Sequence, residues 1–317
     1  MKTSVHGIHH VTCIAGDAQE NLEFYVGVLG MRLVKRSVNQ DAPDTYHLFY
    51  ADAAGTPGTD LTFFPWPNMG PARLGIGLTV EVLLAIPSGS LKYWRERFKQ
   101  NSVVSSTLET RFGEPTLPFI DPHGLRLALV ETDENRQFVP WEKSPVSPER
   151  QVRGLHSVRI WEDQLAPTEM LLTEHMGFTS LGTEDGWHRY AVAGGGSGKL
   201  IEVKVLPEEH RGRWGTGVVH HVAWRTNDSD EEMALRDRIE GAGLYPTPQI
   251  NRFWFKSVYF REPGGTLFEL ATDGPGLDYD EDLERLGERL ILPPWLEARR
   301  KEIEAALPPL EVPRGRV

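Results

Sequence analysis

The sequence predicts an α+β protein made of four consecutive βαβββ modules and a C-terminal helical extension. Three observations support this fold class. Four segments repeat one order, in which an apolar strand precedes an amphipathic helix and two or three strands that end near a glycine turn. A hydrophobic content of 39% over 317 residues supplies material for two cores. A stretch rich in proline and charge separates the second copy from the third.

The first and fourth copies are the most alike. The first opens with GIHHVT, continues through a helix begun by Asp17, and ends in YHLFY and GTDLTFFPW. The fourth opens with VHHVAW, has a helix capped by Asp228 or Ser229, and ends in FWFKSVYF, a Glu-Pro-Gly-Gly turn and TLFELA. Such caps satisfy free amides at a helix start, and glycine suits a helix end. The expected helix ends are Gly27, Gly30 and Gly243.

The second and third copies follow the same template. The second runs from GLTVEVLLAIP to FIDPHGLRLALVE, and the third runs from GLHSVRIWED to GKLIEVKV. Between them, ENRQFVPWEKSPVSPERQVRG is typical of an interdomain linker. We therefore predict modules 1 and 2 in residues 1–146, modules 3 and 4 in residues 147–275, and the helical extension in residues 276–317.

Composition restricts the function classes. The formal charge of −11 opposes binding to nucleic acid or to anionic membranes. The single cysteine, Cys13, excludes an intrachain disulfide and a thiolate-rich metal site, so any metal must be bound by histidine and carboxylate. The N-terminus lacks an apolar signal-peptide core, and no apolar stretch approaches the ~18 residues that span a bilayer. We expect a cytoplasmic protein with Cys13 buried as a small hydrophobe.

The glycine-rich stretch AGGGSGK lacks the spacing of a phosphate-binding loop and lies between two predicted strands. We expect it to be a hairpin loop.

Repeated βαβββ modules resemble the vicinal oxygen chelate superfamily, which includes glyoxalase I, antibiotic-resistance proteins and type I extradiol dioxygenases. The resemblance covers roughly residues 5 to 275. It implies that paired modules form two cup-like mixed β-sheet barrels, with metal ligands on the first and last strands of each module. On these strands the copies offer His10, His156, His221, Glu202 and Glu269.

Two ligand sets are open at this point. Two HHV doublets and a carboxylate after a Pro-Gly-Gly turn form the set that leaves open positions on nonheme iron(II). Only one histidine of each doublet can point straight into a cup, because successive strand residues face opposite sides. Pairing of the adjacent third and fourth modules would instead give His156, Glu202, His221 and Glu269, a glyoxalase-like set.

A narrower resemblance, to the hydroquinone and chlorohydroquinone 1,2-dioxygenases and their quinone-stress relatives, extends over nearly the whole chain. It is carried by GIHHVT, NLEFYVGVLGMRLVK, VNQDAPDTYHLFY, GTPGTDLTFFPWP, VHHVAW and LPPWLE. It implies that His10, His221 and Glu269 bind iron(II), a site that manganese or zinc could also occupy. The first module would then pair with the fourth, and the second with the third.

The same resemblance implies catalytic roles for residues around the metal. Arg252 is expected to hold an ionised phenol or carboxylate, and Tyr259 to hydrogen-bond to substrate oxygen or move a proton. Thr12, His9 and His220 complete the expected set.

The implied activity is oxygen-dependent ring cleavage of a hydroquinone- or catechol-like aromatic, a step in aromatic compound catabolism. The expected partners are this small aromatic substrate and O2, and the sequence is compatible with a homo-oligomer. Two alternatives remain: a glyoxalase-type lyase or isomerase using zinc, nickel or cobalt, and a metal-free protein that binds an aromatic ligand. A requirement for oxygen would distinguish ring cleavage from the first alternative. Ligand binding that does not need a metal would favour the second alternative over both enzymes.

Overall fold

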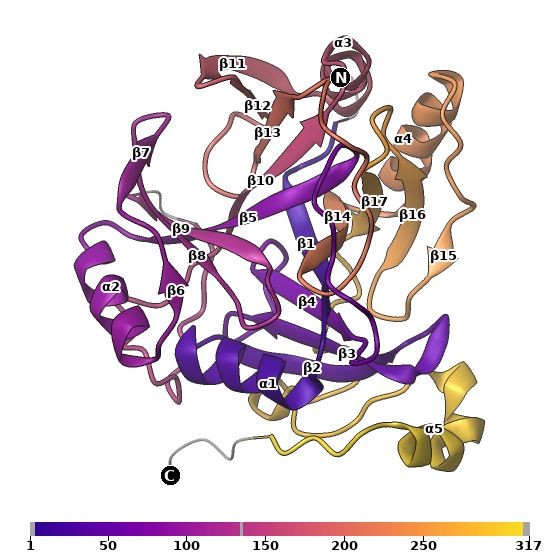
Figure 1. Ribbon diagram of the computed structural model, residues 1–317. Coiled ribbons are helices and arrows are strands. Elements are labelled where there is room, and N and C mark those ends of the chain that lie inside the picture. The colour runs from indigo at the N-terminus through magenta and orange to yellow at the C-terminus, as the bar shows by residue number, and fades with distance from the viewer. Residues whose placement is uncertain (1–3, 134–135, 313–317) are drawn as a thin grey trace.

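The computed structural model describes residues 4–133 and 136–312. Its strands form two curled mixed sheets, one of eight strands and one of nine, with the helices on the outside (Figure 1). The largest apolar cluster includes side chains from both sheets, and Cys13 is buried in it, as predicted. No helix within the described residues is long and apolar enough to cross a membrane.

The first sheet combines the first and fourth modules, as the narrower resemblance implied. Its order is β15-β16-β17-β14-β1-β4-β3-β2, and the antiparallel pair β1 and β14 joins the two modules. Its strands are β1 Ile8–Ala15, β2 Arg32–Asn39, β3 Ala42–Ala51, β4 Asp60–Pro65, β14 Val218–Thr226, β15 Ile250–Asn251, β16 Lys256–Arg261 and β17 Leu267–Thr272.

The second sheet combines the second and third modules in the same way. Its order is β11-β12-β13-β10-β5-β9-β8-β6, and β7 pairs with β8 off this path. Its strands are β5 Leu78–Pro87, β6 Val104–Ser105, β7 Glu109–Arg111, β8 Glu114–Ile120, β9 Arg126–Thr132, β10 Gly154–Glu162, β11 Thr179–Glu184, β12 Trp187–Ala191 and β13 Leu200–Val205. The AGGGSGK stretch connects β12 to β13, as predicted for a hairpin loop.

The boundary predicted near residue 146 falls in the long connection between β9 and β10. The first two residues of the expected linker, Glu134 and Asn135, lie outside the described residues. Each sheet takes strands from both sides of this boundary, so a division into separable domains there stays a prediction.

One helix covers each module. They are α1 Ala18–Leu22 with a π-helical continuation Glu23–Val28, α2 Leu91–Gln100, α3 Ala166–Met170 with a π-helical continuation Leu171–Met176, and α4 Ser229–Gly241. The carboxylates of Asp17 and Asp228 accept hydrogen bonds from the amides of Glu20 and Glu231, each at 2.9 Å, as expected of N-caps.

Two of the three expected helix-ending glycines have the left-handed conformation that suits such a position. Gly30 and Gly243 have φ of +72° and +86°. Gly27 lies inside the π-helical segment, where the Leu29 amide donates to the carbonyl of Phe24, five residues back, at 3.0 Å. The expectation that Gly27 ends the helix is therefore wrong, because wider turns carry the helix past it.

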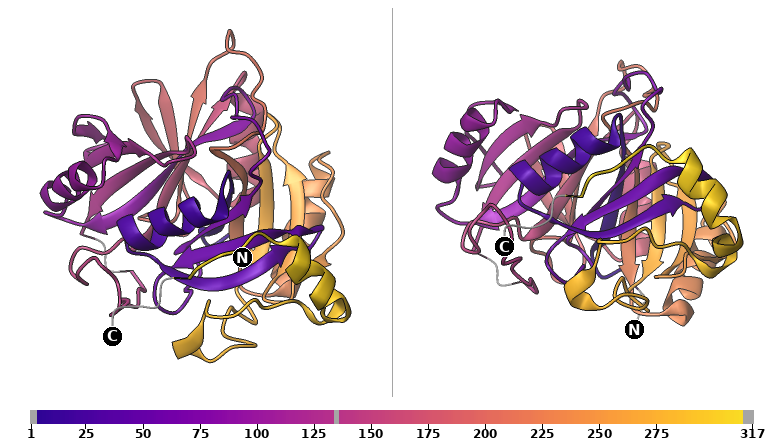
Figure 2. Two further views of the ribbon diagram at one scale, coloured as in Figure 1. Left: turned by 60° about the horizontal axis from the view of Figure 1, so that its bottom comes forward. Right: turned by 90° about the horizontal axis from the view of Figure 1, so that it is seen from below.

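The C-terminal extension lies along the strands of the first module (Figure 2). It consists of 3-10 segments Leu283–Arg285 and Pro294–Arg299, and helix α5 Arg300–Ala306. It is less helical than predicted, since Gly287 has φ +79° and stands against the backbone of Leu33. Buried Lys35 fixes the extension by ion pairs with Asp280 and Glu281, at 2.8 and 2.5 Å.

Candidate metal centre

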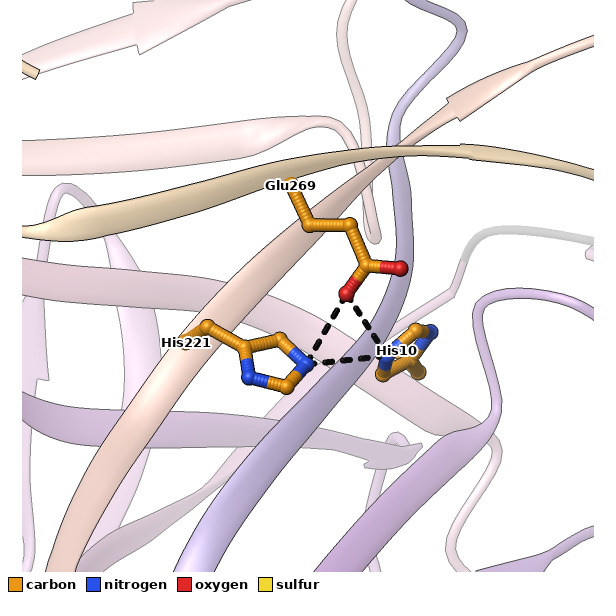
Figure 3. Close-up of side chains that lie close together, drawn as sticks. All are labelled: His10, His221 and Glu269. Atoms are coloured by element: carbon orange, nitrogen blue, oxygen red, sulfur yellow. Dashed lines mark hydrogen bonds and ion pairs between the residues drawn. The ribbon is translucent and has the colours of Figure 1, made fainter. Parts of the chain in front are cut away.

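Three buried side chains converge inside the first sheet (Figure 3). His10 comes from β1, His221 from β14 and Glu269 from β17. Glu269 Oε2 lies 2.9 Å from Nε2 of His221 and 3.4 Å from Nε2 of His10, and the two nitrogens are 3.3 Å apart. Among the described residues, this is the group of His, Cys, Asp or Glu whose ligand atoms all lie within 4.8 Å of one another.

Strand register brings these residues together. Antiparallel β1 and β14 pair His10 with Ala223, two residues beyond His221. Parallel β14 and β17 pair Ala223 with Glu269. The two histidines thus face the cup from neighbouring strands, with Glu269 beside them, because side chains two positions apart on a strand share one face.

The other histidine of each doublet contacts the candidate ligand next to it. Nδ1 of His9 lies 2.9 Å from Nδ1 of His10, and Nδ1 of His220 lies 2.9 Å from Nδ1 of His221. Burial lowers the pKa of His9 and of His220 to about 3, so both rings are neutral and can accept a hydrogen bond. With His9 and His220 as acceptors, His10 and His221 carry their proton on Nδ1. Each then presents an unprotonated Nε2, the state that binds a metal.

The converging atoms fit a divalent cation. Glu269 Oε1 accepts a hydrogen bond from Ser257 at 2.5 Å, whereas the buried Oε2 has no hydrogen-bond donor among the described residues. Burial alone would raise the pKa of Glu269, but positive charge and N–H donation from the His10 and His221 rings, present when Nε2 is protonated, hold it well below its usual value. When Nε2 is unprotonated, a bound cation has to supply this positive charge. An ionised oxygen and two nitrogen lone pairs aimed at one point require a positive charge there. Two histidines and one carboxylate also leave coordination positions open for substrate.

A pocket of about 410 Å³ opens onto this group. Its walls include the aromatic side chains Phe49, Phe64, Trp254 and Phe255, with polar groups from His47, His220, Arg252 and Tyr259. An apolar cavity with a few convergent polar groups is the usual form of a small-molecule site. The aromatic walls suit a flat aromatic ligand.

Three expected catalytic residues, His220, Arg252 and Tyr259, line this pocket. The Arg252 guanidinium is 5.3 Å from the centre of the Tyr259 ring and donates to the Asp41 carboxylate at 2.9 and 3.2 Å. Tyr259 pairs with Glu269 across the neighbouring strand. Burial, reinforced by the charge of Glu269, raises the pKa of Tyr259 above its usual value. Its phenol therefore stays protonated and can donate a hydrogen bond.

Thr12 lies in a chain of hydroxyl and imidazole groups. Its Oγ1 is 2.8 Å from Oγ1 of Thr62, which is 2.9 Å from Nε2 of His47. Thr12 is fully buried, and a catalytic role for it stays a prediction. Sequence reasoning missed His47, although it stands in the VNQDAPDTYHLFY motif, and Ser257, which shares a strand face with Tyr259. Burial lowers the pKa of His47 well below its usual value, so its imidazole is neutral.

The second sheet contains His156 and Glu202, but not in a ligand arrangement. In the second sheet, Glu202 pairs with Arg159. In the first sheet, Glu269 pairs with Ala223, two positions after His221. By this register, Ser157 occupies the ligand position of β10, and His156 stands one residue earlier. The alignment of His156 with the ligand histidines is therefore wrong, because a shift of one residue along a strand turns a side chain to the other face.

Cations already satisfy Glu202. Its carboxylate accepts from Nε of Arg159 at 2.6 Å and from Nη2 of Arg189 at 2.8 Å. Arg189 also binds Glu114 at 2.6 Å, and Nε2 of His156 lies 3.3 Å from Glu114. The glyoxalase-like set is divided between two sheets, since His156 and Glu202 lie in one, and His221 and Glu269 in the other.

Comparison with known proteins agrees with this architecture. The family model of the Glyoxalase/Bleomycin resistance protein/Dioxygenase superfamily matches residues 7–129 and 154–270. "Putative ring-cleaving dioxygenase MhqO" of Bacillus subtilis (strain 168) is 41% identical over 312 residues, which cover 98% of this chain and 99% of that protein. The chlorohydroquinone/hydroquinone 1,2-dioxygenase of Sphingobium indicum is 34% identical over 305 residues, covering 94% and 95%.

Solved structures give the same result. A crystal structure described as a "putative dioxygenase from Bacillus subtilis" superposes with a TM-score of 0.92 at 40% identity, covering 99% of each chain. Glyoxalase I from Zea mays superposes with a TM-score of 0.64 at 14% identity, covering 89% of this chain and 97% of that one. The second likeness concerns the fold alone.

Proposed function

Because this chain belongs to the Glyoxalase/Bleomycin resistance protein/Dioxygenase superfamily, we propose that it is a ring-cleaving dioxygenase acting with O2 on hydroquinone- or catechol-like aromatics. One observation carries the proposal. Two imidazole nitrogens and one carboxylate oxygen converge in a pocket with aromatic walls. Relatives of the same length with dioxygenase names support it.

We propose iron(II) as the cofactor, bound by His10, His221 and Glu269, with manganese or zinc as other occupants that this ligand set accepts. Iron(II) held there would supply the redox chemistry that lets an ionised aromatic hydroxyl react with dioxygen. We also propose that the protein acts in the cytoplasm, because that compartment is reducing and keeps a single free cysteine as a thiol.

Side chains of the pocket would bind and orient the substrate. The Arg252 guanidinium favours an ionised phenol oxygen through charge-assisted hydrogen bonds. Tyr259 holds its proton and can donate it to a substrate oxygen as charge develops. The aromatic walls exclude water from the ring faces and hold the ring by stacking.

The test is anaerobic reconstitution with iron(II), followed by oxygen uptake and ultraviolet detection of products from hydroquinones and catechols. His10→Ala should lose bound iron and activity with its circular dichroism unchanged. His156→Ala, which alters a buried histidine of the other sheet, should keep both. Bound metal without oxygen uptake on any substrate would refute ring cleavage and favour a glyoxalase-type lyase. Unchanged iron in His10→Ala would refute the site.

A further inference from the structure

Three side chains of the pocket wall come from one tight turn between β15 and β16. Arg252, Trp254 and Phe255 all line the cavity of about 410 Å³. The Arg252 amide closes the turn by donating to the carbonyl of Phe255 at 2.9 Å. Phe253, at the centre of the turn, contacts the C-terminal extension instead.

Phe253 holds this turn in a strained conformation. Its φ is +76°, in the left-handed region that bulky residues rarely adopt. A residue keeps such a conformation only where the surrounding structure over-determines it, and residues of this kind cluster at active sites and ligand clamps. Contacts from outside the turn must therefore hold Phe253 in place.

The C-terminal extension supplies contacts to Phe253. The Phe253 ring packs edge to face against Tyr279 and Trp295, with centroid distances of 5.5 and 6.1 Å. Tyr279 is 62% exposed and Trp295 is 49% exposed, so burial of their own surface explains their positions poorly. Their packing against Phe253 gives both aromatic rings a role at the turn.

A second group of contacts holds Trp254. Its indole Nε1 donates to Oδ1 of Asp280 at 3.0 Å, and its carbonyl accepts from the amide of Gly276 at 2.9 Å. Nζ of buried Lys35 lies 2.8 Å from the same Oδ1 and 5.3 Å from the centre of the indole ring. Asp280 is thus fixed by a cation, and the indole cannot rotate without losing a hydrogen bond.

Trp254 and Arg252 transmit this anchoring to the cavity. The Trp254 ring is T-shaped to Phe49 at 6.1 Å, and both rings belong to the aromatic wall. Arg252 precedes Trp254 by two positions, with the strained Phe253 between them. A movement of the turn would therefore displace the aromatic wall and the guanidinium together.

We propose that the C-terminal extension is a positioning element of the active site, in which Asp280, Tyr279 and Trp295 hold the turn so that Arg252 and Trp254 meet the ligand. The three residues of the extension lie outside the cavity lining and act through Phe253 or Trp254. This inference rests on the proposed function, because it takes the cavity as the site of the aromatic substrate.

The experiment compares two replacements of Asp280 that both remove its charge. Asp280→Asn keeps an oxygen that can accept from the indole, whereas Asp280→Leu does not. Both variants lose the ion pair with Lys35, so a difference between them reports the hydrogen bond to Trp254. Asp282→Asn, at an exposed position of the same extension, is the matched control.

Binding of hydroquinone and of catechol is measured by calorimetry on zinc-loaded protein, because zinc has no redox chemistry and gives no turnover. Asp280→Leu should bind the preferred probe about tenfold more weakly than the wild type, the value of one hydrogen bond, and Asp280→Asn should stay within about twofold. In iron(II)-loaded protein the loss should appear in KM with kcat little changed, since a displaced wall weakens binding before and during the reaction alike.

The Trp254→Phe background tests the route from Asp280 to the ligand. Phenylalanine has no N–H group, so Asp280→Leu should cause no further loss of affinity in this background. An equal loss in both backgrounds would show that Asp280 acts through general stability and would refute its positioning role.

Tyr279→Ala and Trp295→Ala test the other anchor at exposed positions, where no buried charge is disturbed. Each should loosen Phe253, so amide hydrogen exchange in the peptide 250–256 should be faster than in the wild type. Each should also weaken binding of the aromatic probe. These variants decide the question if Asp280→Leu does not fold.

The outcomes separate this inference from the proposed function. If Asp280→Leu binds like Asp280→Asn, or if Tyr279→Ala and Trp295→Ala leave exchange and affinity unchanged, positioning by the extension is refuted even when oxygen uptake is normal. If the affinities fall as expected but the iron(II)-loaded wild type consumes no oxygen, positioning stands and ring cleavage is refuted. A wild type that binds neither probe would refute the use of the cavity on which the inference depends.

Discussion

Nδ1 of His9 lies 2.9 Å from Nδ1 of His10, and the second doublet repeats this contact in His220 and His221. With the first histidine of each doublet as hydrogen-bond acceptor, the second carries its proton on Nδ1 and presents an unprotonated Nε2, the form that can bind a metal. A partner that orients a ligand imidazole in this way commonly changes metal affinity by about 10- to 100-fold.

Replacement of His9 tests this relationship. His9→Leu removes the acceptor for the Nδ1 proton of His10, so iron(II) affinity should fall by about 10- to 100-fold. His9→Asn should lose less, because its Oδ1 can occupy the place of Nδ1 and accept the same hydrogen bond. Competition with a coloured chelator measures the affinity. Equal affinity of His9→Leu and the wild type would contradict the assignment.

Arg252 should contribute to substrate binding and turnover without holding the metal. Arg252→Met removes the cation facing the substrate oxygen, and a charge-assisted hydrogen bond of this kind is worth about 10- to 100-fold in kcat/KM. Oxygen-uptake kinetics and iron content should be measured together. Asp41→Asn, which alters the exposed partner of Arg252, should have a smaller effect. Loss of iron in Arg252→Met would show that its role is structural.

Glu202 should stabilise the second sheet without affecting the metal centre. Glu202→Ala removes the buried carboxylate that Arg159 and Arg189 share and leaves them only Glu81 and Glu114 as partners, which should lower the free energy of unfolding by as much as about 3 kcal/mol. Urea denaturation measures this loss, and Glu208→Ala at an exposed position should change stability by less than about 0.5 kcal/mol. Reduced iron content of the folded Glu202 variant would argue for a second ligand site.

Glu162 should make stability depend on pH. Burial and the neighbouring Glu262 raise the pKa of Glu162 from 4.5 to about 9. Between these values the folded state binds a proton that the unfolded state has lost, so stability is fully present below about pH 4.5 and falls as the pH rises toward about 9, by at most ~1.4 kcal/mol per pH unit.

Glu162→Gln should remove this dependence, because its amide imitates the protonated acid. The difference in Tm between pH 5 and pH 8.5 should therefore shrink in the variant. Glu208→Gln serves as the exposed control. An unchanged difference in Glu162→Gln would mean that another group is responsible.

The sequence predicted the features that periodicity and local chemistry determine. Alternating apolar patterns located the modules, and the two HHV doublets identified the histidines that meet in the first sheet. Local rules also found the N-caps Asp17 and Asp228, because a cap bond spans only three residues.

Strand register was harder to predict. Apolar alternation shows which residues share a face, but it does not fix the alignment of one strand with another copy, and His156 was placed one residue off for this reason. Ser257 and His47 were not predicted because neither has a sequence signal of its own. Each is identified only by its hydrogen bond to the neighbouring strand, to Glu269 and Thr62 respectively. The helical extent of the C-terminal extension depended on Gly287, which fits against Leu33 only in the folded protein.

The pairing of the first module with the fourth has a consequence for synthesis. His10 and His221 are 211 positions apart, and the middle modules pair with each other between them. On the ribosome, β1 emerges early, but the strands that complete its sheet, β14 and β17, are synthesised much later. A nascent chain that stops before Leu267 lacks Glu269. Binding of a metal ion by all three proposed ligands would thereby require synthesis to have passed Glu269.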